Sequence, residues 1–233
     1  MTLHRFLERH RDELGAPVQI HHNRFGPGTV LVGVGIWLLC GAFLLLAPDL
    51  PVGGLVAVLS ILALAVAAVL VLMLGEVVVV CERGLVLGPT GLFRRPFLVR
   101  YDQITPGSLV PVHRARRYTS TTGRKNRTAI VRNFEWVSRG IHFVGPAAGD
   151  ALRGGGRPGI IATNHQRSVD GRWIWFLGTG STAPETVTAQ IAQASGRAGF
   201  SELARATATA PPRALSGRRA DVARLLPGYP APR

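Results

Sequence analysis

The sequence predicts a membrane α-helical hairpin followed by an all-β or α+β domain of about seven strands that a C-terminal helix caps. Two long uncharged apolar runs precede residue 75, and after it the apolar pattern changes from helical to strand-like. One amphipathic helix pattern closes the domain. The predicted organisation is a cytoplasmic N-terminal segment with a short amphipathic helix (1–27), a two-helix transmembrane hairpin (28–75), a cytoplasmic domain (76–198) and a disordered basic, Pro-rich tail (199–233).

The apolar runs are residues 30–47 and 52–74, and neither contains an ionisable side chain. As helices they measure about 27 and 35 Å, close to the roughly 30 Å of a hydrocarbon core. The four-residue connector PDLP is a tight reversal, since its prolines end both helices. Basic residues flank the runs at Arg5, Arg9, Arg11, Arg24, Arg83, Arg94 and Arg95. The positive-inside rule then predicts a multi-pass protein of the inner or plasma membrane with both termini in the cytoplasm.

The charge is strongly asymmetric. The chain has a formal net charge of +14, and the part after residue 75 holds 23 basic and 9 acidic residues. Such a domain would be attracted to anionic partners. Cys40 and Cys81 form neither a disulfide framework nor a metal-ligand spacing, so no metal or other cofactor is predicted.

Strand-like stretches follow the second run. They cover 76–82, 84–93, 97–104, 108–112, a hairpin within 128–145, then 159–164 and 172–178. Thr182 and Glu185 form a capping-box pattern with Pro184 in the first turn. This pattern predicts an amphipathic helix that ends near Gly196.

Three stretches carry a resemblance to a known family: E-x-G-L-x-L at 82–87, FLVRYDQITPGSLVPV at 97–112 and WIWFLGTGSTAPETVTAQIAQ at 173–193. Their order after a two-span hairpin resembles the bacterial pleckstrin-homology-like (PH-like) membrane proteins. The resemblance covers residues 76–196 and implies a curved antiparallel sheet closed by the C-terminal helix. It also implies a non-enzymatic binding or scaffold module at the cytoplasmic membrane surface, with no catalytic residues to carry over.

A basic cluster is the predicted binding surface, low in aromatic side chains and concentrated in one loop. Its members are Arg94, Arg95, Arg100, Arg114, Arg116, Arg117, Arg124, Lys125 and Arg127. The expected partners are anionic lipid head groups, a protein or a second copy of the chain, besides the bilayer itself. Two alternatives stay open. One is a solvated loop whose arginines only determine the orientation in the membrane. The other is nucleic-acid binding, for which a basic loop with one aromatic residue is weak evidence.

An enzymatic alternative rests on one motif. Asn164, His165 and Asp170 match N-H-x4-D, which resembles the acyltransferase motif of glycerolipid synthesis, with His165 as base and Asp170 orienting it. Only 63 residues follow Asp170, and the E-G-T-R phosphate-binding block is absent. The sequence therefore favours a protein that is not an enzyme.

Overall fold

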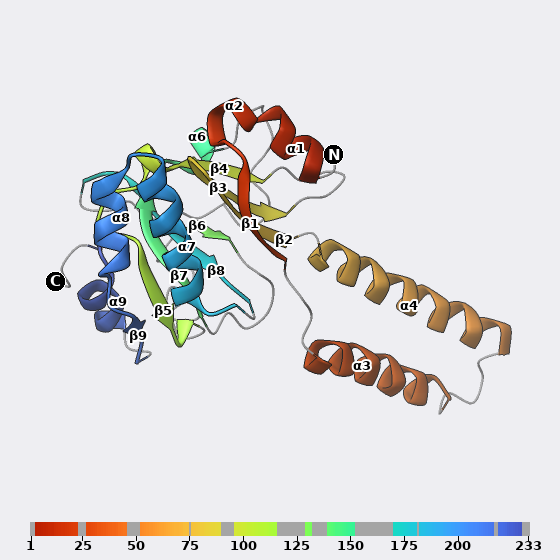
Figure 1. Cartoon of the computed structure of the whole chain (residues 1–233). Coiled ribbons are helices and arrows are strands. Elements are labelled where there is room, and N and C mark those ends of the chain that lie inside the picture. Colours follow the sequence, from red (N-terminus) through yellow and green to blue (C-terminus); the bar gives the residue numbers. More distant parts are fainter. Residues whose placement is uncertain are drawn as a thin grey trace. The chain divides into compact units, whose positions relative to one another are not determined.

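The computed structural model of the chain describes residues 3–22, 27–45, 52–74, 76–89, 96–115, 129–131, 139–151, 170–180, 182–216 and 219–229. The chain divides into two compact units. One consists of Met1–Asn23 and Gly75–Arg233, and the other of Arg24–Leu74. Figure 1 labels the elements of both units, which are described separately below.

The smaller unit is a pair of helices, α3 (Pro27–Leu45) and α4 (Val52–Leu74). Both form where the sequence predicts helices, because neither run contains a proline, the residue that disfavours a helix most strongly. The indole Nε1 of Trp37 donates a hydrogen bond to the carbonyl oxygen of Leu59 at 3.4 Å. That bond joins the two helices to each other.

The prediction that these two helices cross a membrane is not supported. Within the described residues, no helix combines the length and apolar character that a membrane span requires. This finding overturns the predicted transmembrane hairpin, and with it the assignment to a multi-pass protein of the cell membrane.

The first sheet of the larger unit is antiparallel, and its strands follow one another in chain order. They are β1 (Pro17–His22), β2 (Glu76–Cys81), β3 (Gly84–Pro89) and β4 (Phe97–Arg100). Successive side chains of a strand point to opposite faces. Val78 and Val80 enter the central core, while Val77 and Val79 enter a second cluster, so β2 is buried on both sides.

The N-terminal segment is part of this unit. Helices α1 (Leu3–Arg9) and α2 (Arg11–Leu14) contribute Phe6 and Leu14 to the second cluster, which covers the outer face of β2. The sequence predicts the helix at this position but not β1, which pairs with β2. Residues 3–22 therefore complete the sheet and cover it.

In the part of the chain that the structure describes, the second sheet has five strands in the order β6-β8-β7-β5-β9. They are β5 (Val110–His113), β6 (Ala129–Val131), β7 (Arg139–Gly145), β8 (Trp173–Gly178) and β9 (Arg213–Ala214). The predicted hairpin within 128–145 is wrong, because β6 pairs in parallel with β8 and not with β7. The predicted strand at 159–164 lies outside the described residues. A 3₁₀ turn, η1 (Tyr101–Gln103), and a short helix, α6 (Ala148–Ala151), lie in the connections.

The helices described after β8 are α7 (Pro184–Arg197), α8 (Ser201–Ala208) and α9 (Arg219–Leu225). Helix α7 confirms the predicted amphipathic helix, although its N-cap is Ala183 and no side chain caps it, so the predicted capping box does not form. The central core joins both sheets to α7 and α8, with Phe143 and Trp175 stacked at 5.8 Å between ring centroids. A C-terminal cluster joins β5, β7 and β8 to α9.

The fold class is therefore corrected. Among its described residues, the larger unit contains helices and two sheets, of four and five strands, in place of one PH-like curved sheet closed by a single helix. The tail predicted to be disordered contains α8, β9 and α9. The reason lies in strands such as β2 and β8, whose continuous apolar sequences bury both faces and need a covering layer on each side.

Candidate binding groove between α7 and α8

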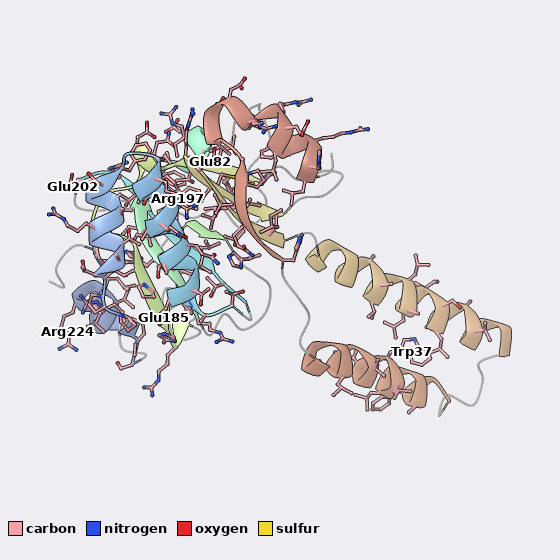
Figure 2. The ribbon with its side chains drawn as sticks, viewed as in Figure 1. Trp37, Glu82, Glu185, Arg197, Glu202 and Arg224 are labelled. Atoms are coloured by element: carbon pink, nitrogen blue, oxygen red, sulfur yellow. The ribbon has the colours of Figure 1, made fainter. Side chains whose placement is uncertain are left out.

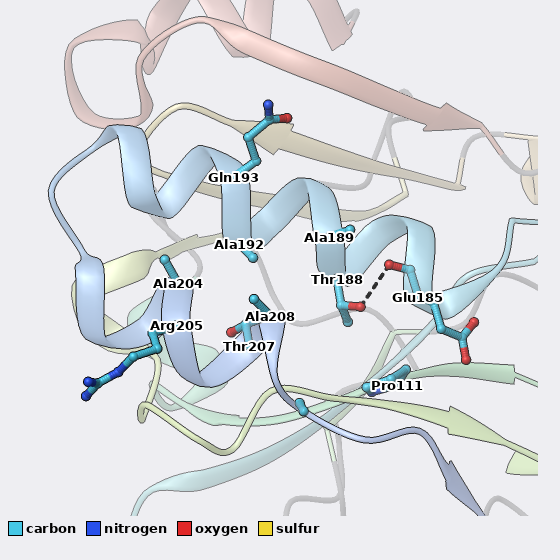
Figure 3. A pocket seen from close by; sticks show the side chains of 11 residues that line it. Pro111, Glu185, Thr188, Ala189, Ala192, Gln193, Ala204, Arg205, Thr207 and Ala208 are labelled. Carbon is cyan, nitrogen blue, oxygen red and sulfur yellow. Dashed lines mark hydrogen bonds between the residues drawn. The ribbon is translucent and has the colours of Figure 1, made fainter.

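A groove of about 560 Å³ lies between α7 and α8 (Figure 3). Its volume falls within the roughly 300–1,000 Å³ of small-ligand pockets. Pro111 of β5 contributes to its lining. The helical walls consist mainly of small side chains: Thr188, Ala189 and Ala192 from α7, and Ala204, Thr207 and Ala208 from α8.

The groove forms because the two helices approach closely at one end and are lined by small side chains beyond it. A Cβ added at Gly196 would lie 3.4 Å from the Cβ of Ala204, so the helices meet near their connecting turn. Gly199 takes a φ of +89° there, which favours glycine. The amide of Phe200 donates to the carbonyl oxygen of Ser195 at 2.9 Å and closes the turn. Alanine and threonine further along leave unfilled volume between the helices.

One end of the groove carries charge. The carboxylate of Glu185 pairs with Nε2 of His113, which ends β5. His113 lies opposite Arg139 in the β5–β7 register, and Nε of Arg139 donates to the carbonyl oxygen of Gly180 at 3.2 Å. Burial raises the pKa of Glu185, but the hydrogen bond with His113 and the charge of Arg139 outweigh it and lower that pKa. Glu185 is thus an ionised carboxylate at neutral pH.

The α8 wall contains a polar group without a partner. Thr207 is 3% exposed, and its Oγ1 finds no hydrogen-bond partner among the described residues. In contrast, Oγ1 of Thr188 on the opposite wall donates to the carbonyl oxygen of Glu185 at 3.0 Å (Figure 3). A buried hydroxyl without a partner costs about 1–3 kcal/mol. The Oγ1 atom of Thr207 is itself almost inaccessible to solvent, so a molecule in the groove would bond to it only after this side chain rotates.

A second buried polar group lies in the C-terminal cluster. His142 is fully buried on β7, and its Nε2 donates to the carbonyl oxygen of Pro227 at 2.8 Å. Its ring stacks on Tyr229 at 5.8 Å between centroids. Burial lowers the pKa of His142 to about 4, although the bond to Pro227 acts in the opposite direction. This histidine is neutral at pH 7 and joins β7 to the chain after α9.

The predicted basic surface is only partly described. Arg94, Arg95, Arg116, Arg117, Arg124, Lys125 and Arg127 lie outside the described residues. Arg100 makes two hydrogen bonds with Asp102, of 3.0 and 2.9 Å, so its charge is paired locally. Arg114 is exposed and has a φ of 57° directly after β5. Neither arginine lines the groove.

The acyltransferase motif stays a prediction, because His165 lies outside the described residues. Asp170 is exposed in the turn before β8, where its Oδ1 accepts a bond from the amide of Arg172 at 3.3 Å. Across the described part of the chain, no group of three or more His, Cys, Asp or Glu residues could hold a metal ion.

Sequence reasoning missed the groove because half of it lies in the segment assigned to a disordered tail. The segment SELARATA offers a signal: Ala-rich composition, Glu202 in the first turn, and Leu203 and Thr207 four residues apart on one face. His113 and Arg139 were not singled out, since their pairing depends on the strand register and the contact of His113 with Glu185 depends on the tertiary fold.

Comparisons of the chain with protein-family models, with curated proteins and with solved structures find no match. The resemblance to the PH-like membrane proteins accordingly stays a prediction without support from known proteins.

Proposed function

We propose that this protein is a non-enzymatic binding module and that the groove between α7 and α8 is its ligand site. The observation that carries the proposal is Thr207, a buried hydroxyl that has no partner among the described residues and lies in a wall lined also by Ala204 and Ala208. Pockets of this kind bind ligands through apolar contacts and orient them with a few polar groups. A ligand that accepts a hydrogen bond from Thr207 would satisfy that hydroxyl.

The test uses the full chain labelled with ¹³C at its alanine methyl groups, because alanine lines both walls of the groove. Neutral amides and alcohols of about ten heavy atoms or fewer are the probes. Binding should shift the methyl signals of Ala192, Ala204 and Ala208, and leave those of Ala63 and Ala65 in α4 unchanged. If no probe moves the groove signals, the proposed site is wrong.

Two matched variants sharpen this test. Ala189→Trp adds a large side chain at the exposed rim of the groove and should abolish probe binding, whereas Thr186→Trp, exposed on the same helix but outside the groove lining, should not.

Thr207→Val removes the hydroxyl with little change of shape. It should weaken probe binding while the free energy of unfolding stays equal or rises, since a buried group without a partner is removed.

A further inference from the structure

The two charged residues that line the groove lie at its opposite ends. Figure 3 shows Glu185 on the first turn of α7 at one end and Arg205 on α8 at the other, with the alanine walls between them. His113 occupies Oε1 of Glu185, and a carboxylate has about four acceptor sites, so Glu185 can still bind a donor. The described residues include no ion-pair partner for the exposed guanidinium of Arg205.

We propose that the occupant of the groove is a short apolar peptide with free termini, its ammonium group at Glu185 and its carboxylate at Arg205. This inference rests on the proposed function. Charge complementarity at both ends supports a zwitterion over a simple cation or anion. An amine alone would leave Arg205 unpaired, and an acid alone would meet Glu185 at the other end.

The length of the α7 wall matches a peptide of about three residues. Seven helical steps separate Glu185 from Ala192 along the α7 wall, which is about 10 Å. Three extended residues also span about 10 Å. The small walls leave room for apolar side chains.

Three peptides test the inference on the full chain at low ionic strength: Leu-Ala-Leu with free termini, its N-acetyl form and its C-terminal amide. Titration followed by the alanine methyl signals gives the three dissociation constants. Each blocked end should weaken binding roughly threefold to fivefold, as expected for a partly exposed ion pair.

The charge variants assign each end. Glu185→Gln should remove the preference for the free amine over the acetylated form, and Arg205→Gln the preference for the carboxylate over the amide. Glu202→Gln and Arg197→Gln are the matched controls, because both residues are exposed on α8 and α7 and do not line the groove (Figure 2). Neither control should alter the preferences.

The outcomes separate this inference from the proposed function. Equal affinities for all three peptides, with neutral probes still bound, would overturn the zwitterion and leave the groove as a binding site. A preference that survives both charge variants would also overturn it. If neither the peptides nor the neutral probes shift the groove signals, both proposals fail.

Discussion

His142 makes the stability of the larger unit depend on pH. The folded pKa is about 4, below the ordinary value of 6.5, because the imidazole is fully buried. Between these values the unfolded chain binds a proton that the folded chain excludes, so stability falls as pH is lowered through this window. We expect a loss of about 3 kcal/mol from this residue between pH 7 and pH 4. Urea unfolding of the full chain at several pH values measures it.

The control for His142 is His142→Gln, which keeps a donor for the carbonyl oxygen of Pro227 but does not titrate. The variant should be less stable at pH 7 and should lose less stability on acidification than the unmodified chain. The carboxyl groups contribute equally to the pH dependence of the free energy of unfolding in both proteins. Their contribution therefore cancels when the two proteins are compared. Identical pH dependence in the two proteins would show that His142 is not the residue responsible.

At the scale of single elements, the pairing of β7 with β8 depends on the absence of a side chain at Gly140. A Cβ there would lie 2.3 Å from the carbonyl oxygen of Leu177 and 2.5 Å from Cζ of Phe176. Gly140→Ala should therefore destabilise the protein by about 1–3 kcal/mol, as overpacking does. The midpoint of urea unfolding provides the measurement.

Gly149→Ala is the matched control for this prediction. Gly149 lies in α6, and a Cβ added there would have no heavy atom within 4 Å. Alanine favours a helix by up to about 1 kcal/mol over glycine, so this variant should be neutral or slightly stabilised. Equal losses in both variants would contradict the close approach of β7 and β8.

For the larger unit as a whole, α9 supplies one of the layers that close the core. Val222, Leu226 and Tyr229 belong to the cluster that buries Phe176 and Val112. Deleting residues 217–233 should lower the melting temperature, because each apolar side chain of this kind contributes about 1.5–3 kcal/mol when buried. Differential scanning calorimetry of the full and shortened chains measures the change.

Deleting only residues 230–233 is the control for that truncation, since it retains the α9 side chains of the cluster. Its melting temperature should match that of the full chain. If the chain without residues 217–233 melts at the same temperature too, the C-terminal cluster does not stabilise the unit.

Local sequence pattern predicted many individual elements correctly. The helical runs of α3 and α4, the β-branched strand β2, the aromatic strand β8 and the amphipathic helix α7 all form where their periodicity indicates. Pairing was less predictable. Residues 129–131 read as half of a hairpin, yet β6 pairs with β8, because the choice of strand neighbour depends on distant chain segments.

The candidate site was even less accessible to sequence reasoning. Glu185 was singled out only as part of a capping box, and the structure gives it a different partner, His113, which is 72 residues away in the chain. Thr207 and Arg205 lie in a segment whose Ala- and Arg-rich composition indicated disorder. That segment is helical because Leu203 is buried in the central core.

The sequence by itself determined the positions of the main helices and several strands, the +14 charge and the absence of a disulfide framework. These properties follow from local periodicity and composition. Only the tertiary structure decided the two-sheet arrangement, the folding of the C-terminal segment and the groove between α7 and α8. Each of these depends on contacts between residues far apart in the chain, such as the approach of Gly196 to Ala204 and the pairing of His113 with Glu185.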